Sequence, residues 1–432
     1  MGFVRTIIVF VYSLLMTVAI PLLKALSLCS PRLKHQLKDR PQLLELGRRI
    51  GKIRAGKKNA LMILASSAGE FEQARPIIDR LTKDGDTFVH VVFWSQSGAN
   101  YARKRGETIS WCLAPFDTTW QWGLLFSAVS PTATIVIRHE LWPGFLETAK
   151  AWGPCYLVNA VADTTAPKRF KRWAKRFTLS FFNRIFTVSE QDATNIRSLY
   201  GIAKEVVVAT GDTKYDRALE RAASNETSAT EYRKTLADNF PGRDFVVIGS
   251  AYQPDWNLCF ANADLIHSRH FIPLIVPHDV DSDNIAAAIA DAKNAGLTPV
   301  RWTQMQQATP ETNVIIVDVL GCLAELYSCS RAAYVGGGQH RKVHNVLEPA
   351  AYNLPIAHGP KFHNSSEAIM MQDLNTIVSS AAEFSEWVEK ALEEKPQTRA
   401  FLESKAGAAK ILTEQCWPNT DAQKYSQIES NA

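Results

Sequence analysis

Short, unbroken apolar runs recur along the first half of the chain, and each is followed by a turn of small or polar residues and then by a stretch with helical spacing. They lie at residues 61–65, 88–93, 109–114, 134–137, 155–160, 184–188 and 206–210. Continuous apolar runs of this length are typical of parallel strands that are buried on both faces. Strands that alternate with helices in this way predict a doubly wound parallel sheet, and therefore an α/β fold.

The same pattern returns after a polar helical stretch, residues 217–240, which ends at Pro241-Gly242. Later runs at residues 245–250, 271–277, 296–300, 314–318, 332–336 and 355–360 predict a second sheet. A chain of 432 residues is too long for one ordinary core. We therefore expect an N-terminal anchor (1–30), a first α/β domain (31–218), a second α/β domain (219–400) and a C-terminal helix and tail (401–432). Strand ends with small or ionisable residues in both domains predict a cleft between them.

The N-terminus carries one almost uncharged stretch, residues 7–23, and basic residues follow it between Arg32 and Lys58. About 17–25 apolar residues are needed to span a bilayer, so this stretch could cross the membrane or lie obliquely in one leaflet. A cleaved signal peptide is the alternative, but it would carry its charge before the apolar run. Positive charge after the run marks the cytoplasmic side. We expect a retained anchor with the body of the protein in the cytoplasm.

Composition narrows the class of protein. Hydrophobic residues make up 46% of the chain and aromatic residues 10%, which excludes a disordered protein. The seven cysteines form no CxxC pair. We read them as free thiols in a reducing compartment, because structural zinc or a disulfide framework would need tighter spacing.

The net charge of +5 matters less than its distribution. In residues 167–182, basic side chains that include Lys168, Arg169 and Arg172 alternate with aromatic ones at helical spacing. This arrangement suits an anionic membrane surface or lipid headgroup. Nucleic acid is a rival partner, but no recognised nucleic-acid module accompanies the patch, so we expect none. A solvated basic face over a buried aromatic stripe is the third interpretation.

Two carboxylates follow predicted strands of the first domain. Glu70 ends the sequence Ser66-Ser67-Ala68-Gly69-Glu70 after the first strand, and Glu140 follows the fourth. Open α/β sheets bind ligands at the carboxyl ends of their strands, which makes Glu70 our candidate general base. The alternative is purely structural, because Ser67 and Glu70 have the spacing of a helix capping box.

Three glycines, Gly336, Gly337 and Gly338, end a strand of the second domain, and a helix is expected to begin near Asn345. Backbone amides without a Cβ can approach a phosphate closely, so this corner is a candidate nucleotide site. Alternatively, His344 and Asn345 could merely cap the helix. Asp281-Ser-Asp283 fits a helix start better than a metal-binding Asp-x-Asp motif, and we expect no metal or other cofactor.

Five motifs, taken in order, resemble those of one known family. They are residues 66–70, 139–143, 211–216, 318–327 and 336–351. Each motif is weak alone, but the ordered set resembles the bacterial 3-deoxy-D-manno-octulosonic acid (Kdo) transferases of lipopolysaccharide assembly. The resemblance covers most of the body as well as the N-terminal anchor.

The resemblance implies a GT-B glycosyltransferase, with two Rossmann-like domains facing across a cleft. It would take Kdo from CMP-Kdo and attach it to a lipid A precursor at the cytoplasmic face of the inner membrane. The reaction would invert the anomeric carbon without a metal, with Glu70 as base and Glu140 lining the site. The residues expected to bind the donor are Ser250, Pro277, His278, Gly321, Gly336, Gly337, Gly338, His344, Asn345 and Glu348. Those expected to bind the acceptor are Ser67, Gly69, Arg103, Arg105, Lys168, Arg169 and Arg172.

The chain also departs from the family pattern. Pro277-His278-Asp279 stands where the family often has Pro-Arg-His, and Gly338 stands where serine is common. Arg138 replaces the first carboxylate of a Glu-Thr-Glu-Leu-Trp motif. Two other functions stay open: another GT-B enzyme, such as a nucleotide-sugar epimerase or a different lipid glycosyltransferase, and a non-catalytic, membrane-attached protein that binds lipid or nucleotide.

Overall fold

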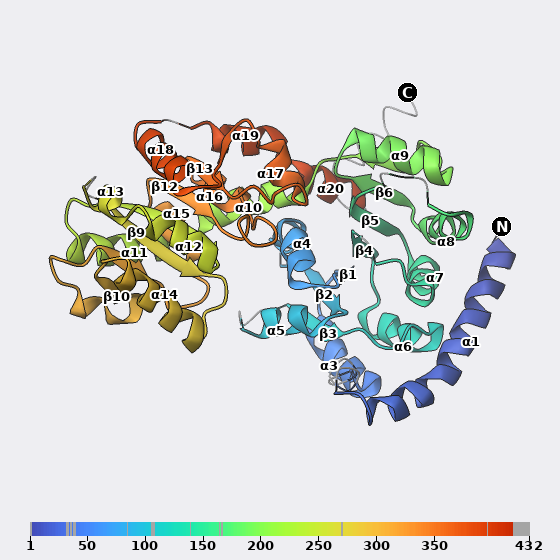
Figure 1. The fold of residues 1–432 in the computed structure, drawn as a ribbon. Helices are drawn as coiled ribbons and strands as arrows, with labels where there is room; N and C mark the ends of the chain where they lie inside the picture. Colours follow the sequence, from blue (N-terminus) through green and yellow to red (C-terminus); the bar gives the residue numbers. More distant parts are fainter. Residues whose placement is uncertain are drawn as a thin grey trace. The chain divides into compact units, whose positions relative to one another are not determined.

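The computed structural model describes residues 2–31, 34, 37, 40–83, 85–104, 109–138, 140–163, 165, 167–268, 271–394 and 396–417. The chain divides into two compact units. Unit 1 comprises Met1–Arg217 with Ala406–Ala432, and unit 2 comprises Ala218–Lys405. In Figure 1, unit 1 comprises the blue to green elements, and the chain returns to it at helix α20. Unit 2 comprises the yellow and orange elements.

Unit 1 is built on a sheet of seven parallel strands in the order β3-β2-β1-β4-β5-β6-β7. The strands are β1 (Asn59–Leu64), β2 (Thr87–Phe93), β3 (Ser110–Leu113), β4 (Ala133–Ile137), β5 (Cys155–Ala160), β6 (Arg184–Thr187) and β7 (Val207–Ala209). Each predicted apolar run of the first half overlaps one of them. The predicted doubly wound sheet is therefore confirmed for this unit.

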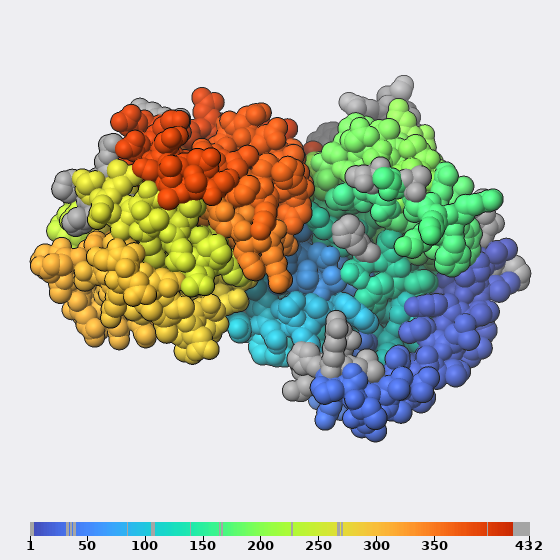
Figure 2. Space-filling model, viewed as in Figure 1, coloured from blue at the N-terminus to red at the C-terminus, as the bar shows by residue number. Residues whose placement is uncertain are grey.

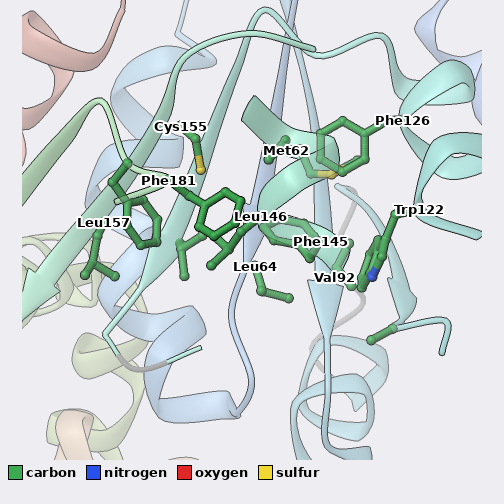
Figure 3. Packing of buried hydrophobic residues seen from close by; sticks show 14 of the residues in the cluster. Met62, Leu64, Val92, Trp122, Phe126, Phe145, Leu146, Cys155, Leu157 and Phe181 are labelled. Atoms are coloured by element: carbon green, nitrogen blue, oxygen red, sulfur yellow. The ribbon is translucent and has the colours of Figure 1, made fainter. Parts of the chain in front are cut away.

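Both faces of the unit 1 sheet are covered, because successive residues of β1 point into different cores. Met62 and Leu64 join a cluster with residues of α3 (Leu43–Arg54), α6 (Thr119–Val129), α7 (Pro143–Trp152), α8 (Arg169–Leu179) and α9 (Glu190–Tyr200), part of which is drawn in Figure 3. Leu61 and Ile63 join a cluster with residues of α4 (Ala68–Leu81), α5 (Gln96–Lys104) and α20 (Ala408–Cys416). Alternation across one strand thus explains an apolar run without polar positions.

Unit 2 has a second sheet of seven parallel strands, in the order β10-β11-β9-β8-β12-β13-β14. They are β8 (Asp244–Ala251), β9 (Phe271–Pro277), β10 (Pro299–Arg301), β11 (Val314–Ile316), β12 (Ala332–Val335), β13 (Ile356–His358) and β14 (Asn375–Ile377). The first six overlap predicted runs. The helical elements are α11 (Glu226–Asn239), α12 (Gln253–Phe260), α13 (Ala263–Ser268), α14 (Ser282–Asn294), η1 (Trp302–Gln307), α15 (Leu323–Ser328), α16 (Leu347–Ala351), α17 (Ser366–Met370), α18 (Ala381–Ala391) and α19 (Thr398–Lys405).

The polar stretch 217–240 was expected to form one helix, and this prediction is wrong. It forms two, α10 (Thr213–Ser224) and α11, separated at Asn225. Asn225 has φ −84° and ψ 2°, outside helical geometry, and its carbonyl accepts the amide of Ala229.

The strand order reverses at corresponding places in the two sheets. In unit 1, β1 lies between β2 and β4, and in unit 2, β8 lies between β9 and β12. Open α/β sheets bind ligands outside the carboxyl ends of the strands at such switch points. The loops after β1 and β4, and those after β8 and β12, are therefore the places to look for function.

Helix α1 (Gly2–Ser27) precedes the first sheet. Among the described residues it is the helix that is long and apolar enough to cross a membrane, over Val4–Ser27. It contacts α7 and runs along the outside of unit 1 in Figure 1. All seven cysteines are free, as predicted.

Candidate functional site: strand-end loops of the two units

Glu70 lies in the first turn of α4, directly after β1. The Ser67 hydroxyl accepts the amide of Glu70 at 3.4 Å and so caps the helix, as the spacing predicted. The Glu70 carboxylate accepts the amide of Ser66 rather than that of the capping residue, so the reciprocal half of the capping box is displaced by one residue. The side chain turns back over the end of β1 and is only 9% exposed.

Burial raises the pKa of the Glu70 carboxyl above its ordinary value. The hydrogen bond from Ser66 lowers that pKa, the charge of Glu140 raises it, and the charge of Arg138 lowers it. Both neighbours follow β4, so the structure brings the two predicted catalytic carboxylates, Glu70 and Glu140, to the same strand ends. A carboxylate whose pKa is raised toward neutrality is better suited to accept a proton.

Arg138 holds three segments of the chain together. Its Nε donates to Gln73 Oε1 of α4 at 2.7 Å, and its Nη2 donates to Asp212 Oδ2 at 3.0 Å. Its backbone is in the left-handed region, with φ 62°. The sequence showed Arg138 only as a departure from a family pattern. Its ion pair with Asp212, which belongs to another motif, gives it a defined place.

Asn159 and Thr213 belong to the same set of hydrogen bonds as Arg138 and Gln73. Asn159 Nδ2 donates to Gln73 Oε1 at 3.1 Å and to Thr213 Oγ1 at 2.6 Å, and the Thr213 hydroxyl donates to the Gln73 carbonyl at 2.7 Å. Asn159 and Thr213 are fully buried. We call the set Gln73, Arg138, Asn159, Asp212 and Thr213 the strand-end network. It fixes the start of α4 and α10 relative to β4 and β5.

The other predicted acceptor residues of α4 and α5 have different surroundings. Gly69 adjoins Glu70 and has open space where a Cβ would point. Arg103 donates to Asn100 Oδ1 at 2.9 Å and lies over the Trp111 ring of β3 at 5.6 Å, so its contacts are with the edge of the sheet and not with Glu70. Arg105 and His139 lie outside the described residues.

Helix α8 exposes its aromatic side chains as well as its basic ones. Phe170 is 75% exposed and Trp173 51%, and the rings of Phe170, Trp173 and Phe177 stack in sequence at 6.0 and 5.7 Å. The interpretation of a solvated basic face over a buried aromatic stripe therefore fails for the first half of the helix. Lys168, Arg169 and Arg172 are largely exposed along the same half.

Two basic residues of α8 that the predicted site left out line a cavity together with Arg138 of the strand-end network. This cavity of about 390 Å³ is lined by Arg138, Phe170, Lys171 and Lys175 together with apolar residues of β5 and α9. Lys175 also forms an ion pair with Asp163 at 2.9 Å. Their helical spacing, four residues apart, was the available signal, but only the fold shows which face of α8 meets Arg138.

In unit 2 the glycine loop packs tightly against its own surroundings. The amide of Gly336 donates to the Gly249 carbonyl at 2.8 Å, and that of Gly337 donates to Asp255 Oδ2 at 2.9 Å. A Cβ on Gly336 would lie 2.5 Å from the Ser250 carbonyl oxygen. These two amides are thus engaged inside the loop, and the contact of the glycines with the donor stays a prediction.

Asp255 at the start of α12 organises that loop and was not predicted. Its carboxylate is fully buried and accepts the amides of Gly337 and Tyr252, each at 2.9 Å, and the hydroxyl of Tyr334 at 3.3 Å. Burial raises the pKa of Asp255, and these hydrogen bonds lower it. The residue has no sequence signal beyond its place in a helix start.

Four rings gather beside the glycine loop. His278 and His344, both predicted, stack at 4.4 Å with an angle of 20° between their planes. Tyr252 packs on them at 4.9 and 5.7 Å, and on His340 at 5.2 Å. Burial, then the nearby His278 and Lys342, lower the pKa of His344 to about 4, and its buried Nε2 has no hydrogen-bond partner among the described residues.

The remaining predicted donor residues are dispersed along unit 2. Asn345 accepts, at 3.0 Å, the amide of Leu347, the first residue of the short helix α16, which begins two residues later than expected and has Val346 at its N-cap position. Glu348 forms an ion pair with Arg221 at 2.8 Å. Ser250 has a left-handed backbone (φ 50°), as does Gly321 (φ 88°), and Pro277 ends β9.

The Asp281-Ser-Asp283 sequence forms a helix start, as predicted. Asp281 Oδ1 accepts the amides of Asp283 and Asn284 at 3.0 and 2.8 Å, which caps α14. Within the described ranges, no group of three or more His, Cys, Asp or Glu side chains is placed to hold a metal ion.

Comparison with known proteins relates the chain to one family. Residues 44–217 match the family model described as 3-deoxy-D-manno-octulosonic-acid transferase. The chain is 24% identical to the 3-deoxy-D-manno-octulosonic acid transferase of Chlamydia muridarum, covering 78% of this chain and 79% of that protein. It is also 24% identical to that of Haemophilus influenzae, covering 84% of each.

Solved structures show the same fold at low sequence identity. A glycosyltransferase from Rickettsia africae aligns with a TM-score of 0.54 and 12% identity, over 84% of this chain and all of that one. The UDP-GlcNAc 2-epimerase of Neisseria meningitidis aligns with a TM-score of 0.59 and 14% identity, over 82% of this chain and 98% of that one.

Two doubly wound units with polar strand-end sites and this structural likeness define a protein of the GT-B class, which confirms the predicted fold. Within that class, the chain is similar to the Kdo transferases, as its motifs indicated: their family model matches residues 44–217, and two of them are each 24% identical to it.

Proposed function

We propose that this enzyme transfers Kdo from CMP-Kdo to a lipid A precursor in lipopolysaccharide biosynthesis. The observation that carries the proposal is the buried Glu70 at the switch point of unit 1, beside Glu140 and Arg138, in a chain similar to the Kdo transferases. A general base is the group that sugar transfer to a hydroxyl requires.

The proposed reaction is a direct displacement with inversion at the anomeric carbon of Kdo. Glu70 takes the proton of the acceptor's primary hydroxyl as that oxygen bonds to the anomeric carbon, and the bond from this carbon to the phosphate oxygen breaks. CMP leaves with the bonding electrons. A positioned base contributes about 10²–10⁴-fold. Glu140 lines the proposed site, and its charge adds to the burial that raises the pKa of Glu70.

Donor binding is assigned to unit 2. We propose that CMP-Kdo contacts the glycine loop and the stacked rings of His278 and His344, where Lys342 supplies positive potential near the phosphate. Nucleobases have π-faces that stack on such rings. Ser250, Pro277, Gly321, Asn345 and Glu348 complete the proposed donor site. No metal or other cofactor is part of this proposal.

Acceptor binding is assigned to unit 1 and to the membrane. We propose that α1 holds the protein in the bacterial inner membrane with its body on the cytoplasmic side. The exposed rings and basic residues of α8 suit anionic headgroups. Ser67, Gly69, Arg103 and Arg105 are the other proposed acceptor contacts.

The test is transfer by the full chain, in detergent, from CMP-Kdo to a tetra-acylated lipid A precursor, read by product mass. A mass increase of one or more Kdo units is expected. Thermal stabilisation by UDP-sugars without Kdo product would indicate another GT-B enzyme. Binding of CMP without turnover would indicate a non-catalytic binding protein, and either result would overturn the proposal.

A further inference from the structure

Helix α1 is held along unit 1 by polar contacts on one of its faces. Arg5 pairs with Glu147 at 3.2 Å, Tyr12 donates to Asp117 Oδ2 at 2.9 Å, and the hydroxyls of Ser13 and Thr119 hydrogen-bond at 3.2 Å. Asp117 is buried and also accepts the indole N–H of Trp122 at 2.8 Å. A helix that left the body would break this set, so its membrane contact has to be made while it lies alongside unit 1.

The other face of α1 is apolar and exposed. Its exposed side chains include Val4, Phe10, Leu14, Leu15, Val18, Leu22 and Leu26, all more than half exposed. Figure 2 shows this helix, in dark blue, at the outer surface of unit 1. A helix with one apolar face and one face bound to the protein suits a membrane that meets this side of unit 1.

A cavity of about 990 Å³ lies where the C-terminal half of α1 meets α6 and the start of α3. Most of its wall is apolar, and its basic members are Lys24, Lys34 and Arg40; the apolar members include Ile20, Pro21, Leu43, Leu44, Phe116, Trp120 and Leu124. An apolar pocket of this size with a few charged groups is typical of small-molecule sites. Its chemistry matches a long acyl chain attached to a phosphorylated head.

Arg40 connects this cavity to the loop that carries Glu70. Its guanidinium lies over the rings of Phe116 and Trp94, at 4.4 and 4.9 Å. The Trp94 ring in turn packs on Trp142, two residues beyond Glu140, at 4.5 Å.

Two hydrogen bonds through Ser66 connect the Trp94 region to Glu70. Ser95, next to Trp94, donates its hydroxyl to the Ser66 carbonyl at 2.7 Å, and the amide of Ser66 donates to the Glu70 carboxylate. A continuous series of contacts within unit 1 therefore connects the wall of the cavity to the candidate base.

We propose that this cavity binds one acyl chain of the acceptor lipid, with Lys24, Lys34 and Arg40 attracting a phosphate of its head. This inference rests on the proposed function and adds a determinant of acceptor specificity to it. An acyl chain of a bilayer phospholipid has the same chemistry, and the experiment separates the two sources.

Two substitutions on α1 form a matched pair. Ile20 lines the cavity, whereas Leu22 is 61% exposed on the outer face of the helix. In the full chain, Ile20→Trp should narrow the cavity and raise KM for the tetra-acylated acceptor by about tenfold, which corresponds to 1.4 kcal/mol of lost binding. KM for a deacylated phosphorylated disaccharide and KM for CMP-Kdo should stay unchanged, and Leu22→Trp should change none of the three.

Equal KM values for Ile20→Trp and wild type, or equal losses for both acceptors, would overturn the inference. A second measurement identifies the occupant, because an acceptor analogue and a phosphatidylglycerol, each with a diazirine at an acyl terminus, can be crosslinked to the wild-type chain. Crosslinks from the acceptor analogue to Phe116 or Leu124 are expected. Crosslinks there from phosphatidylglycerol alone would assign the cavity to a bilayer lipid and overturn it. Absence of Kdo product from the wild type would instead overturn the proposed function, while the crosslinking would still test the cavity.

Discussion

Each unit has its own sheet of seven parallel strands, yet different interactions hold the strand-end loops of the two units. In unit 1, side chains hold one another: Arg138 reaches Gln73 and Asp212 at 2.7 and 3.0 Å. In unit 2, the buried carboxylate of Asp255 accepts the amide of Gly337 and backbone packs on backbone, so that a Cβ added to Gly337 would lie 2.3 Å from the Lys342 carbonyl oxygen. Bonds between side chains join the unit 1 loops, whereas hydrogen bonds to backbone amides and close packing fix the unit 2 loop.

This difference matches the different tasks that we propose for the units. Removing a proton requires a carboxylate whose pKa is raised, and burial next to Glu140 raises the pKa of Glu70. Holding a nucleotide requires a surface of fixed shape, which close-packed glycines and stacked rings provide. The same fold can therefore serve chemistry at one switch point and binding at the other, because the residues in the loops differ.

The largest effect that we predict comes from Glu70→Gln. The amide keeps the size of the side chain but cannot accept the acceptor's proton, so kcat should fall by about 10²–10⁴-fold. CMP affinity, measured by calorimetry, should stay the same because the proposed CMP site lies in unit 2. Glu72→Gln is the control on the same helix, since Glu72 pairs with Arg217 at 2.6 Å. A Glu70→Gln enzyme with the full transfer rate would remove Glu70 from the role of base.

The next largest effect concerns the glycine loop. Gly337 has φ +89° and a close neighbour at its Cβ position, whereas Gly296, outside the proposed donor site, has a similar φ, +78°, and open space there. Gly337→Ala should lower CMP-Kdo affinity by about tenfold. Gly296→Ala adds backbone strain alone, about 1–3 kcal/mol. Donor titrations and thermal unfolding of both variants separate strain from displacement of the loop. Equal donor affinity in the two variants would argue against a loop that positions the donor.

Most of the fold could be predicted because parallel strands buried on both faces leave continuous apolar runs. Strand β14 was missed because two of its three residues, Thr376 and Ile377, are exposed. The break at Asn225 was missed because neither glycine nor proline marks it. Local patterns therefore predicted the interior of each sheet and failed where an element is short, exposed or interrupted without a breaker residue.

The candidate site could be predicted only where one segment contains the signal. Ser67 and Glu70 are three residues apart, and their spacing revealed the helix cap. The bond from Arg138 to Gln73 joins residues 65 positions apart, and the bond from Asn159 to Thr213 joins residues 54 apart. No spacing rule covers such pairs, because the sheet and not the local chain brings them together.

A smaller effect tests the charges around Glu70. Arg138 lowers the pKa of Glu70, so Arg138→Met should raise that pKa further. Glu70 accepts a proton only when it is ionised, so the acid side of the pH–rate profile should move to higher pH, and the rate on that side should fall. Arg138→Lys keeps the charge and should leave the acid side near its wild-type position. An unchanged pH–rate profile in Arg138→Met would show that Arg138 of the strand-end network does not control the pKa of Glu70.

The smallest effect is expected from a substitution at Gly69. This glycine of unit 1 can be compared directly with Gly337 of unit 2. No atom lies within 4 Å of a Cβ added there, and its φ is not positive, so Gly69→Ala should leave stability unchanged or raise it by up to about 1 kcal/mol. The new methyl group stands beside Glu70, so KM for the acceptor should rise about two- to fivefold. An unchanged KM would remove Gly69 from the acceptor site. Destabilisation as large as that of Gly337→Ala would break the comparison itself, because unit 1 would then also depend on close packing of its glycine.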